Sequence, residues 1–229
     1  MASRRLTRQG KLRKKQLMSE AARLFSRSGY DATRVADIVR SAGVAKGLFY
    51  WYFENKEALF KEIVASTRDD LRRTQAREIE NEQDPVERIA GGITASLRFF
   101  RENQHLAVLL RFAGAQERFS SLIEEAQEII ASDTARHIEA AIAAGRIAPA
   151  DPMMAAHGVV AIVYHFARLD LSRRFDQPVE ELCAFVAEYC LRALGARESE
   201  RRPAPATSAR PRRAFRDGTS RGRGKAATI

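Results

Sequence analysis

The sequence has only two cysteines, Cys183 and Cys190, and they lie seven positions apart. In a helix this spacing places both on one face but two turns apart, which is too far for a mutual disulfide. A free cysteine usually behaves as a small buried apolar residue, so we predict that both thiols pack in a core. The absence of disulfides fits a reducing cytoplasm.

The residue sets that carry catalysis are also missing. The four histidines have no neighbouring cysteines or acids at metal-ligand spacing. There is no Gly-x-Ser-x-Gly, and Gly224-Lys225 lacks the correctly spaced first glycine and the following Ser or Thr of a phosphate-binding loop. We therefore predict no catalytic residue, no metal site and no cofactor, and the sequence argues against an enzyme.

No strand pattern is present, and no run is clearly long enough to cross a membrane. The most apolar segment, 153–169, is about the minimum length for a span but contains His157, His165 and Arg168. The basic N-terminus is not followed by the apolar segment of a secretory signal. We predict an all-α fold of about nine helices, with 153–169 as a helix that is covered on all sides.

Turn and capping residues divide the chain into these helices. Gly29 is placed to end the first helix and Gly145 to end a long one. Asn55, Asp84 and Asp151 are placed as N-caps, two of them with proline at the next position. The expected helices cover 9–28, two short segments within 33–53, 55 to about 80, 85 to about 102, 105–112, 119–144, 153–169 and 179–194.

Positive charge is concentrated at the two ends of the chain. Residues 1–15 hold seven Lys or Arg and no acid, and 197–229 hold ten Lys or Arg and three acids, whereas 16–196 hold 22 basic and 26 acidic residues. Basic ends favour a polyanion such as nucleic acid, or an acidic membrane surface; the alternative is a solvated tail. The last segment has almost nothing to bury, and we expect it to be disordered.

Residues 33–53 have the pattern of a helix-turn-helix. Val35, Ile38 and Val39 form an apolar stripe, and Gly43 suits the positive φ of a tight turn. In such a motif the second helix enters the major groove of DNA. On spacing alone, two short amphipathic helices of an all-α protein that never touches DNA remain the alternative.

A wider set of residues around this motif resembles the bacterial TetR-type transcriptional regulators. The rest of the chain matches that family only in plan, as an all-α domain whose last two helices suit dimerisation. The matching residues are Leu17, Ala21, Ala22, Leu24, Phe25, Gly29, Tyr30, Thr33, Val35, Ile38, Ala42, Gly43, Val44, Lys46, Gly47, Phe49, Tyr50, Tyr52, Phe53, Lys56, Glu57 and Leu59.

The resemblance implies which residues contact DNA. Thr33 is placed as the N-cap of the first short helix, and Arg34 follows it. The N-terminal amides of that helix are suited to bind a phosphate. Gly47 lets the backbone approach DNA, while Tyr50 and Lys56 resemble the residues that bind phosphates. The implied DNA-binding set is Thr33, Arg34, Ala45, Lys46, Gly47, Leu48, Tyr50, Trp51 and Lys56.

Two positions depart from the family's pattern. Ala45 stands where a small polar residue or proline is common, so one polar contact is in doubt. Trp51 stands where histidine is common, and its indole would alter the preferred DNA sequence. Phe49, Tyr52 and Phe53 look like packing residues, with Tyr52 also placed to reach the DNA backbone.

The resemblance also implies a small-molecule pocket within residues 85–195. An aromatic-rich lining favours an apolar or amphipathic effector; the alternative is that the aromatics are core and the arginines form internal pairs. Dimerisation is expected through the helices at 152–171 and 178–195, so that two chains form a four-helix interface. The expected lining residues are Phe99, Arg111, Phe112, Met154, Tyr164, His165 and Arg168.

Together these features predict three regions. Residues 1–54 form a basic arm and a three-helix DNA-binding head, 55–196 a connector helix with a larger ligand-binding and dimerisation domain, and 197–229 a disordered basic tail. The predicted function is a cytoplasmic homodimeric regulator, nucleoid-associated when bound, that represses from a palindromic operator in double-stranded DNA until a small-molecule effector releases it. No membrane partner is expected.

Two alternatives to this function remain. An architectural DNA-binding protein without an effector would also explain the basic ends, and activation is possible in place of repression. The tail sequence around Arg221-Gly222-Arg223 is suited to a narrow minor groove but only partly resembles an AT-hook; the alternative is a nonspecific solvated tail.

Overall fold

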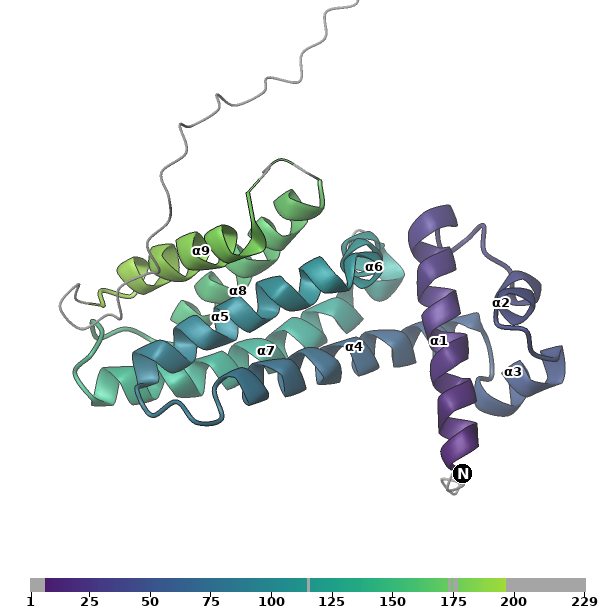
Figure 1. Ribbon diagram of the computed structural model, residues 1–229, viewed down its shortest axis with the longest axis horizontal. Helices are drawn as coiled ribbons and strands as arrows, with labels where there is room; N and C mark the ends of the chain where they lie inside the picture. Colours follow the sequence, from purple (N-terminus) through teal and green to yellow (C-terminus); the bar gives the residue numbers. More distant parts are fainter. Residues whose placement is uncertain (1–6, 115, 173, 175–176, 197–229) are drawn as a thin grey trace, which may run out of the picture.

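The computed structural model describes residues 7–114, 116–172, 174 and 177–196, apart from the side chain of Arg111; the predicted tail at 197–229 lies outside this range. The described residues form nine α-helices and no strand, which confirms the all-α prediction (Figure 1). The helices are α1 (Arg8–Ser28), α2 (Val35–Ser41), α3 (Lys46–Tyr52), α4 (Lys56–Glu78), α5 (Pro85–Glu102), α6 (Gln104–Gly114), α7 (Glu117–Ala143), α8 (Pro152–Leu171) and α9 (Val179–Ala193).

The predicted caps set most of the helix ends. The side-chain oxygens of Asn55, Asp84 and Asp151 accept backbone N–H groups of the first turns of α4, α5 and α8, at 2.8, 2.9 and 2.7 Å. Gly29 follows α1 with φ +85°, and Gly145 follows α7 with φ +67°. These bonds satisfy helix-end groups that would otherwise lack partners, so local sequence specified the boundaries.

The start of α2 differs from the prediction. Arg34, not Thr33, is the N-cap residue, and its backbone N–H donates to the Asp37 carboxylate at 3.1 Å. Thr33 is only 3% exposed, and its hydroxyl donates to the Gly29 carbonyl at 2.7 Å. The threonine therefore closes the loop after α1 rather than capping α2.

One apolar cluster holds the N-terminal helices together, and we call this part the head. It contains Leu17 and Phe25 of α1, Ile38 of α2, Phe49 of α3 and Phe60 of α4, all buried. Because α4 contributes four buried residues from its first half, the head's packing continues past the predicted boundary at residue 54. Each fully buried phenylalanine contributes about 1.5–3 kcal/mol.

A second apolar cluster forms the larger part, which we call the body. It is built from α5, α7, α8 and α9 with the second half of α4, and α5 packs against α4, α7, α8 and α9. Figure 1 shows α4 running from the head along the body, with α8 and α9 on the side away from α4. Cys183 and Cys190 are buried in this cluster as free thiols, as the sequence predicted.

The head and the body share residues of α6 and α7. Leu109 and Ala113 of α6, with Phe119 and Ile123 of α7, belong to the head's cluster although both helices lie in the body's sequence. The rings of Phe60 and Phe119 stack with centroids 4.2 Å apart. A shift of α6 or of the start of α7 would therefore move the surface on which α1 rests.

Candidate nucleic-acid interface and internal cavity

Helix α3 buries one side and exposes the other. Phe49 is fully buried and Phe53 nearly so, because these residues follow the helix spacing toward the head's core. Lys46, Tyr50 and Trp51 are exposed on the opposite side. The exposed side thus carries one cation and two large rings, a combination suited to phosphate and base contacts.

The residues around Gly47 leave this side of α3 open. An added Cβ at Gly47 would meet no atom within 4 Å, so the backbone is accessible there. Ala45 is exposed as the N-cap residue of α3, and Arg34 is exposed at the start of α2, whereas Leu48 is half-buried. Six of the nine predicted DNA-binding residues therefore lie on the head's exposed surface.

Lys56 and Thr33 are instead occupied inside the head. The Lys56 ammonium donates to the carbonyls of Tyr30 and Thr33 at 2.7 and 2.9 Å. It also lies 4.2 Å from the centroid of the Tyr30 ring. Burial lowers the pKa of Lys56 from its ordinary value. These backbone acceptors make Lys56 close the loop between α1 and α2, and its contact with a DNA phosphate stays a prediction.

Tyr52 also forms a hydrogen bond within the protein. Its hydroxyl donates to the Gly10 carbonyl of α1 at 2.9 Å. This bond joins the end of α3 to the start of α1, where Lys11, Arg13 and Lys15 are exposed. The basic segment of the sequence therefore lies beside the exposed side of α3, an arrangement that sequence spacing alone did not predict.

The contact between head and body has a polar part that sequence reasoning missed. Arg118, at the start of α7, forms an ion pair with Asp31 at 2.6 Å and lies over the Tyr30 ring, 4.6 Å from its centroid. Burial raises the pKa of Tyr30, which keeps the phenol neutral. Lys56 of α4 and Arg118 of α7 thus both contact the Tyr30 ring, and these contacts tie α4 and α7 to one loop.

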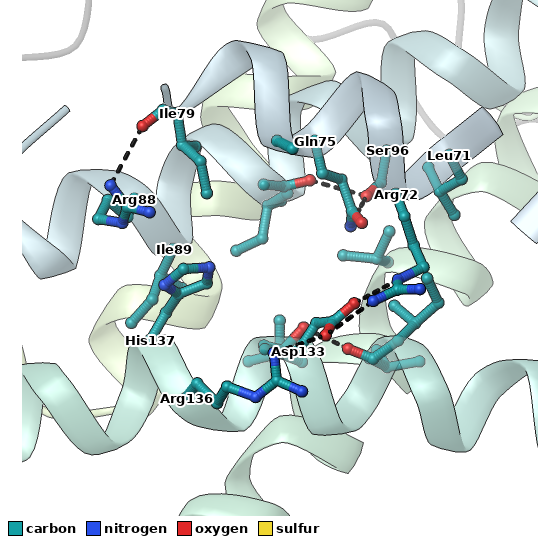
Figure 2. A pocket seen from close by; sticks show the side chains of 18 of the residues that line it. Leu71, Arg72, Gln75, Ile79, Arg88, Ile89, Ser96, Asp133, Arg136 and His137 are labelled. Atoms are coloured by element: carbon teal, nitrogen blue, oxygen red, sulfur yellow. Dashed lines mark hydrogen bonds and ion pairs between the residues drawn. The ribbon is translucent and has the colours of Figure 1, made fainter. Parts of the chain in front are cut away.

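The body has a cavity of about 580 Å³, open to solvent, between α4, α5, α7 and α8. Apolar side chains, among them Leu71, Ile89 and Val163, form much of its wall. Figure 2 shows a polar side made by Arg72, Asp133, Arg136 and His137. Pockets of 300–1,000 Å³ with a few converging polar groups are typical small-molecule sites.

Asp133 is the centre of the polar side of this cavity. Its carboxylate accepts from Arg72 Nε at 2.5 Å and pairs with Arg136 Nη1 at 3.1 Å. Burial lowers the pKa of His137, and the nearby Arg88 lowers it further, so this imidazole is neutral near pH 7. The spacing of Asp133, Arg136 and His137 on one face of α7 is the signal that could have found this site.

The predicted lining residues are only partly in cavities. Tyr164 lines the large cavity, and Tyr164, His165 and Arg168 line a second cavity of about 250 Å³. Phe99 and Phe112 line neither, because Phe99 is buried in the body's core and Phe112 packs against the head's cluster. Met154 is exposed on the outside of α8. Arg111 lies in α6, but its side chain is outside the described residues.

The described part of the chain has neither a cluster of metal ligands nor a membrane-spanning helix. No group of three or more His, Cys, Asp or Glu side chains there could hold a metal ion. No helix among the described residues is long and apolar enough to cross a membrane.

Comparison with known proteins agrees with the geometry of the head. Residues 17–63 match the family model described as "Bacterial regulatory proteins, tetR family". This range contains α2, α3 and the core residues that orient them. The chain belongs to the TetR family. The buried residues of α1, α2 and α3 within this range hold the exposed side of α3 outward.

Relatives of this TetR-family protein are transcriptional regulators rather than enzymes. The uncharacterized HTH-type transcriptional regulator YhgD of Bacillus subtilis is 29% identical over 147 residues, covering 63% of this chain and 76% of YhgD. The HTH-type transcriptional repressor KstR2 of Mycolicibacterium smegmatis is 30% identical over 110 residues, covering 48% of this chain and about half, 53%, of KstR2. The protein is therefore a DNA-binding transcriptional regulator.

Solved structures extend the likeness to the body. The fatty acid degradation regulator FadR of Bacillus halodurans superposes with a TM-score of 0.72 at 17% identity, covering 80% of this chain and 97% of FadR. At this identity the likeness shows the fold alone. A regulator with this fold has a helix-turn-helix head and a helical C-terminal domain, as the sequence predicted.

Proposed function

We propose that this TetR-family regulator binds a palindromic operator as a homodimer and represses transcription until a small-molecule effector releases it. One observation carries the proposal. The exposed large apolar side chains among the described residues fall into two groups, one on the head and one on α8 and α9. The first group suits DNA, and the second suits another copy of the chain.

The DNA-binding part of the proposal rests on the open side of α3. We assign base and sugar contacts to Ala45, Gly47, Leu48, Tyr50 and Trp51. Phosphate contacts are assigned to Arg34, Lys46 and the exposed basic residues of α1 beside α3. Thr33 and Lys56 support binding indirectly, since they hold the loop that precedes α2.

The dimer part of the proposal rests on α8 and α9. Met154 is 76% exposed, Phe185 57% and Tyr189 53%, and the Phe185 and Tyr189 rings stack on each other. Exposed large apolar groups such as the stacked rings of Phe185 and Tyr189 indicate an interaction site. A two-fold pairing of α8 and α9 would bury them and would set the spacing of the two heads on DNA.

The effector part rests on the cavity between α4, α5, α7 and α8. An effector acts only through different affinity for the DNA-competent and DNA-incompetent states. The cavity supports this because its wall includes α4, which also carries head residues. KstR2 is described as a repressor, and this favours repression over activation.

Footprinting on DNA selected from random sequence tests the proposal. We expect protection of one short palindrome and a dimer in sedimentation analysis. Phe185→Glu is expected to yield monomers and weaken operator binding, whereas Arg77→Ala, an exposed residue of α4, serves as the surface control. Broad coating of DNA without a preferred site would support an architectural protein instead.

The variant Trp51→Ala tests directly whether α3 contributes to the choice of operator sequence. Since the indole is half exposed on α3, we expect its loss to change which operators are preferred more than total DNA affinity. Binding selections with both proteins measure this. Identical preferred sequences would show that Trp51 does not read the operator.

A further inference from the structure

The two cavities of the body meet at a shared wall. Leu71, Phe100 and Tyr164 line both the cavity of about 580 Å³ and the cavity of about 250 Å³. Tyr164 is half-buried there, and burial raises the pKa of its phenol to about 12. Its hydroxyl has no hydrogen-bond partner among the described residues. An unpartnered phenol between two cavities is poised to bond to whatever passes between them.

The large cavity is positively charged on its polar side. Four arginines and two aspartates line it. Asp69 is paired with Arg68 and Arg73 with Asp70, and neither Arg68 nor Asp70 lines this cavity. Arg72 and Arg136 both pair with the single carboxylate of Asp133, and Arg88 donates to the backbone carbonyls of Ile79 and Glu82, which leaves an excess of positive charge.

Arg136 is the arginine best placed to receive an anion. Within the described part of the chain its one ion pair is with Asp133, through Nη1 at 3.1 Å, and its side chain is more than half exposed. Figure 2 shows Arg136 beside Asp133 with His137 close by on the same helix. A guanidinium with unused N–H donors forms strong bidentate contacts with carboxylate or phosphate.

The small cavity differs in chemistry and in position. Ala107 and Leu110 of α6 and Ile123 and Ala126 of α7 make an apolar side of its wall. Ile123 belongs to the head's cluster, and Leu110 packs against both clusters. Material that fills this cavity therefore presses on the residues that support the head.

We propose that the effector is one elongated amphipathic anion that occupies both cavities. Its anionic group binds at Arg136 and Arg72, and its hydrocarbon chain passes Tyr164 into the small cavity beside α6 and α7. This inference rests on the proposed function. It separates two requirements: the anion gives affinity, and a chain long enough to enter the small cavity releases the operator.

Linear carboxylates of different length test the proposal, with the neutral alcohol of matched length as comparison. The probes are sodium octanoate, sodium dodecanoate and 1-dodecanol, each below its aggregation concentration. Calorimetry measures binding to the full-length protein, and fluorescence anisotropy measures release of a labelled operator. We expect dodecanoate to bind about tenfold or more tightly than 1-dodecanol, because only the acid pairs with arginine. Octanoate at saturation should bind without releasing DNA.

Matched variants locate the two ends of the ligand. Arg136→Ala should weaken dodecanoate binding about tenfold and leave 1-dodecanol unchanged. Arg77→Ala, an exposed arginine of α4 that lines neither cavity, is the control. Tyr164→Trp should narrow the passage, so that octanoate still binds while dodecanoate no longer releases DNA.

Three results would overturn the proposal. The first is equal affinity for dodecanoate and 1-dodecanol. The second is a loss of affinity for dodecanoate in Arg168→Ala, which changes a residue that lines the small cavity, and not in Arg136→Ala. The third is equal release of the operator by saturating octanoate and dodecanoate. If 1-dodecanol alone releases the operator, the regulator function stands and the anionic effector is wrong; failure to bind any selected DNA would reject the function itself.

Discussion

Replacing Lys56 with methionine distinguishes a structural lysine from a DNA-binding one. The change keeps most of the apolar stem and removes the ammonium that donates to the carbonyls of Tyr30 and Thr33 at 2.7 and 2.9 Å. It also removes the cation from the Tyr30 ring. If these contacts are the lysine's role, Lys56→Met should weaken the head's fold and leave the number of phosphate contacts unchanged.

The contacts of Lys56 allow the size of the effect to be estimated. A hydrogen bond to a charged group contributes about 1.5–3 kcal/mol, so two such bonds set the upper range. Partial burial of the ammonium, which lowers its pKa, opposes this gain because the charge loses water. The net loss expected for Lys56→Met is therefore about 2–4 kcal/mol in the free energy of unfolding of the head.

Urea unfolding followed by tryptophan fluorescence measures this loss in the head. Trp51 is the only tryptophan of the chain, and it lies on α3, so its emission reports on the head rather than the body. Lys61→Met is the matched control, since Lys61 forms an exposed pair with Glu57 on the same helix. Exposed pairs contribute little, so its urea midpoint should stay close to that of the wild type.

Salt dependence of operator binding separates the two roles of Lys56. At temperatures where the variant remains folded, the slope of log affinity against log salt should match that of the wild type. Loss of one phosphate contact would lower the magnitude of that slope by about 0.9. A reduced slope combined with an unchanged urea midpoint would refute our reading of this residue.

Two further predictions follow from burial in the body. Burial raises the pKa of Cys183 and of Cys190 to about 11. Both thiols should therefore resist a disulfide reagent in the native protein at about pH 8 and react after unfolding. Fast reaction of either thiol in the native protein would contradict their packing. Burial lowers the pKa values of His137 and His105 below 6.5, so the unfolded chain binds more protons than the folded chain as the pH falls below 6.5. The free energy of unfolding should therefore keep its full value above pH 6.5 and decrease as the pH drops below 6.5. His137→Gln should reduce this fall, and an unchanged pH profile of urea midpoints would show that His137 does not contribute.

The helices and the head were predictable from sequence because their causes are local. Asp84 and Asp151 each bond to N–H groups two or three residues ahead, and Gly43 adopts φ +65° because its own residue type tolerates it. The apolar spacing that buries Phe49 also turns Tyr50 and Trp51 outward. Caps, turns and the exposed side of a helix therefore depend only on residues close together in the sequence.

The corrections arise where partners come from distant parts of the chain. Lys56 could bond to a phosphate or to the loop at 30–33, and only the packing of α4 against α1 brings that loop within 2.7 Å. Phe99 and Phe112 are aromatic, as expected for residues that line a pocket. The orientation of their helices in the bundle instead buries Phe99 in the body's core and packs Phe112 against the head's cluster. From sequence alone, Asp133, Arg136 and His137 look like an exposed polar face of one helix. They form the polar side of a cavity because α4 and α5 lie opposite that face. Sequence determined which residues are buried or exposed on each helix, and the tertiary structure decided which polar groups meet, because hydrogen bonds and ion pairs depend on distances between helices that no local pattern specifies.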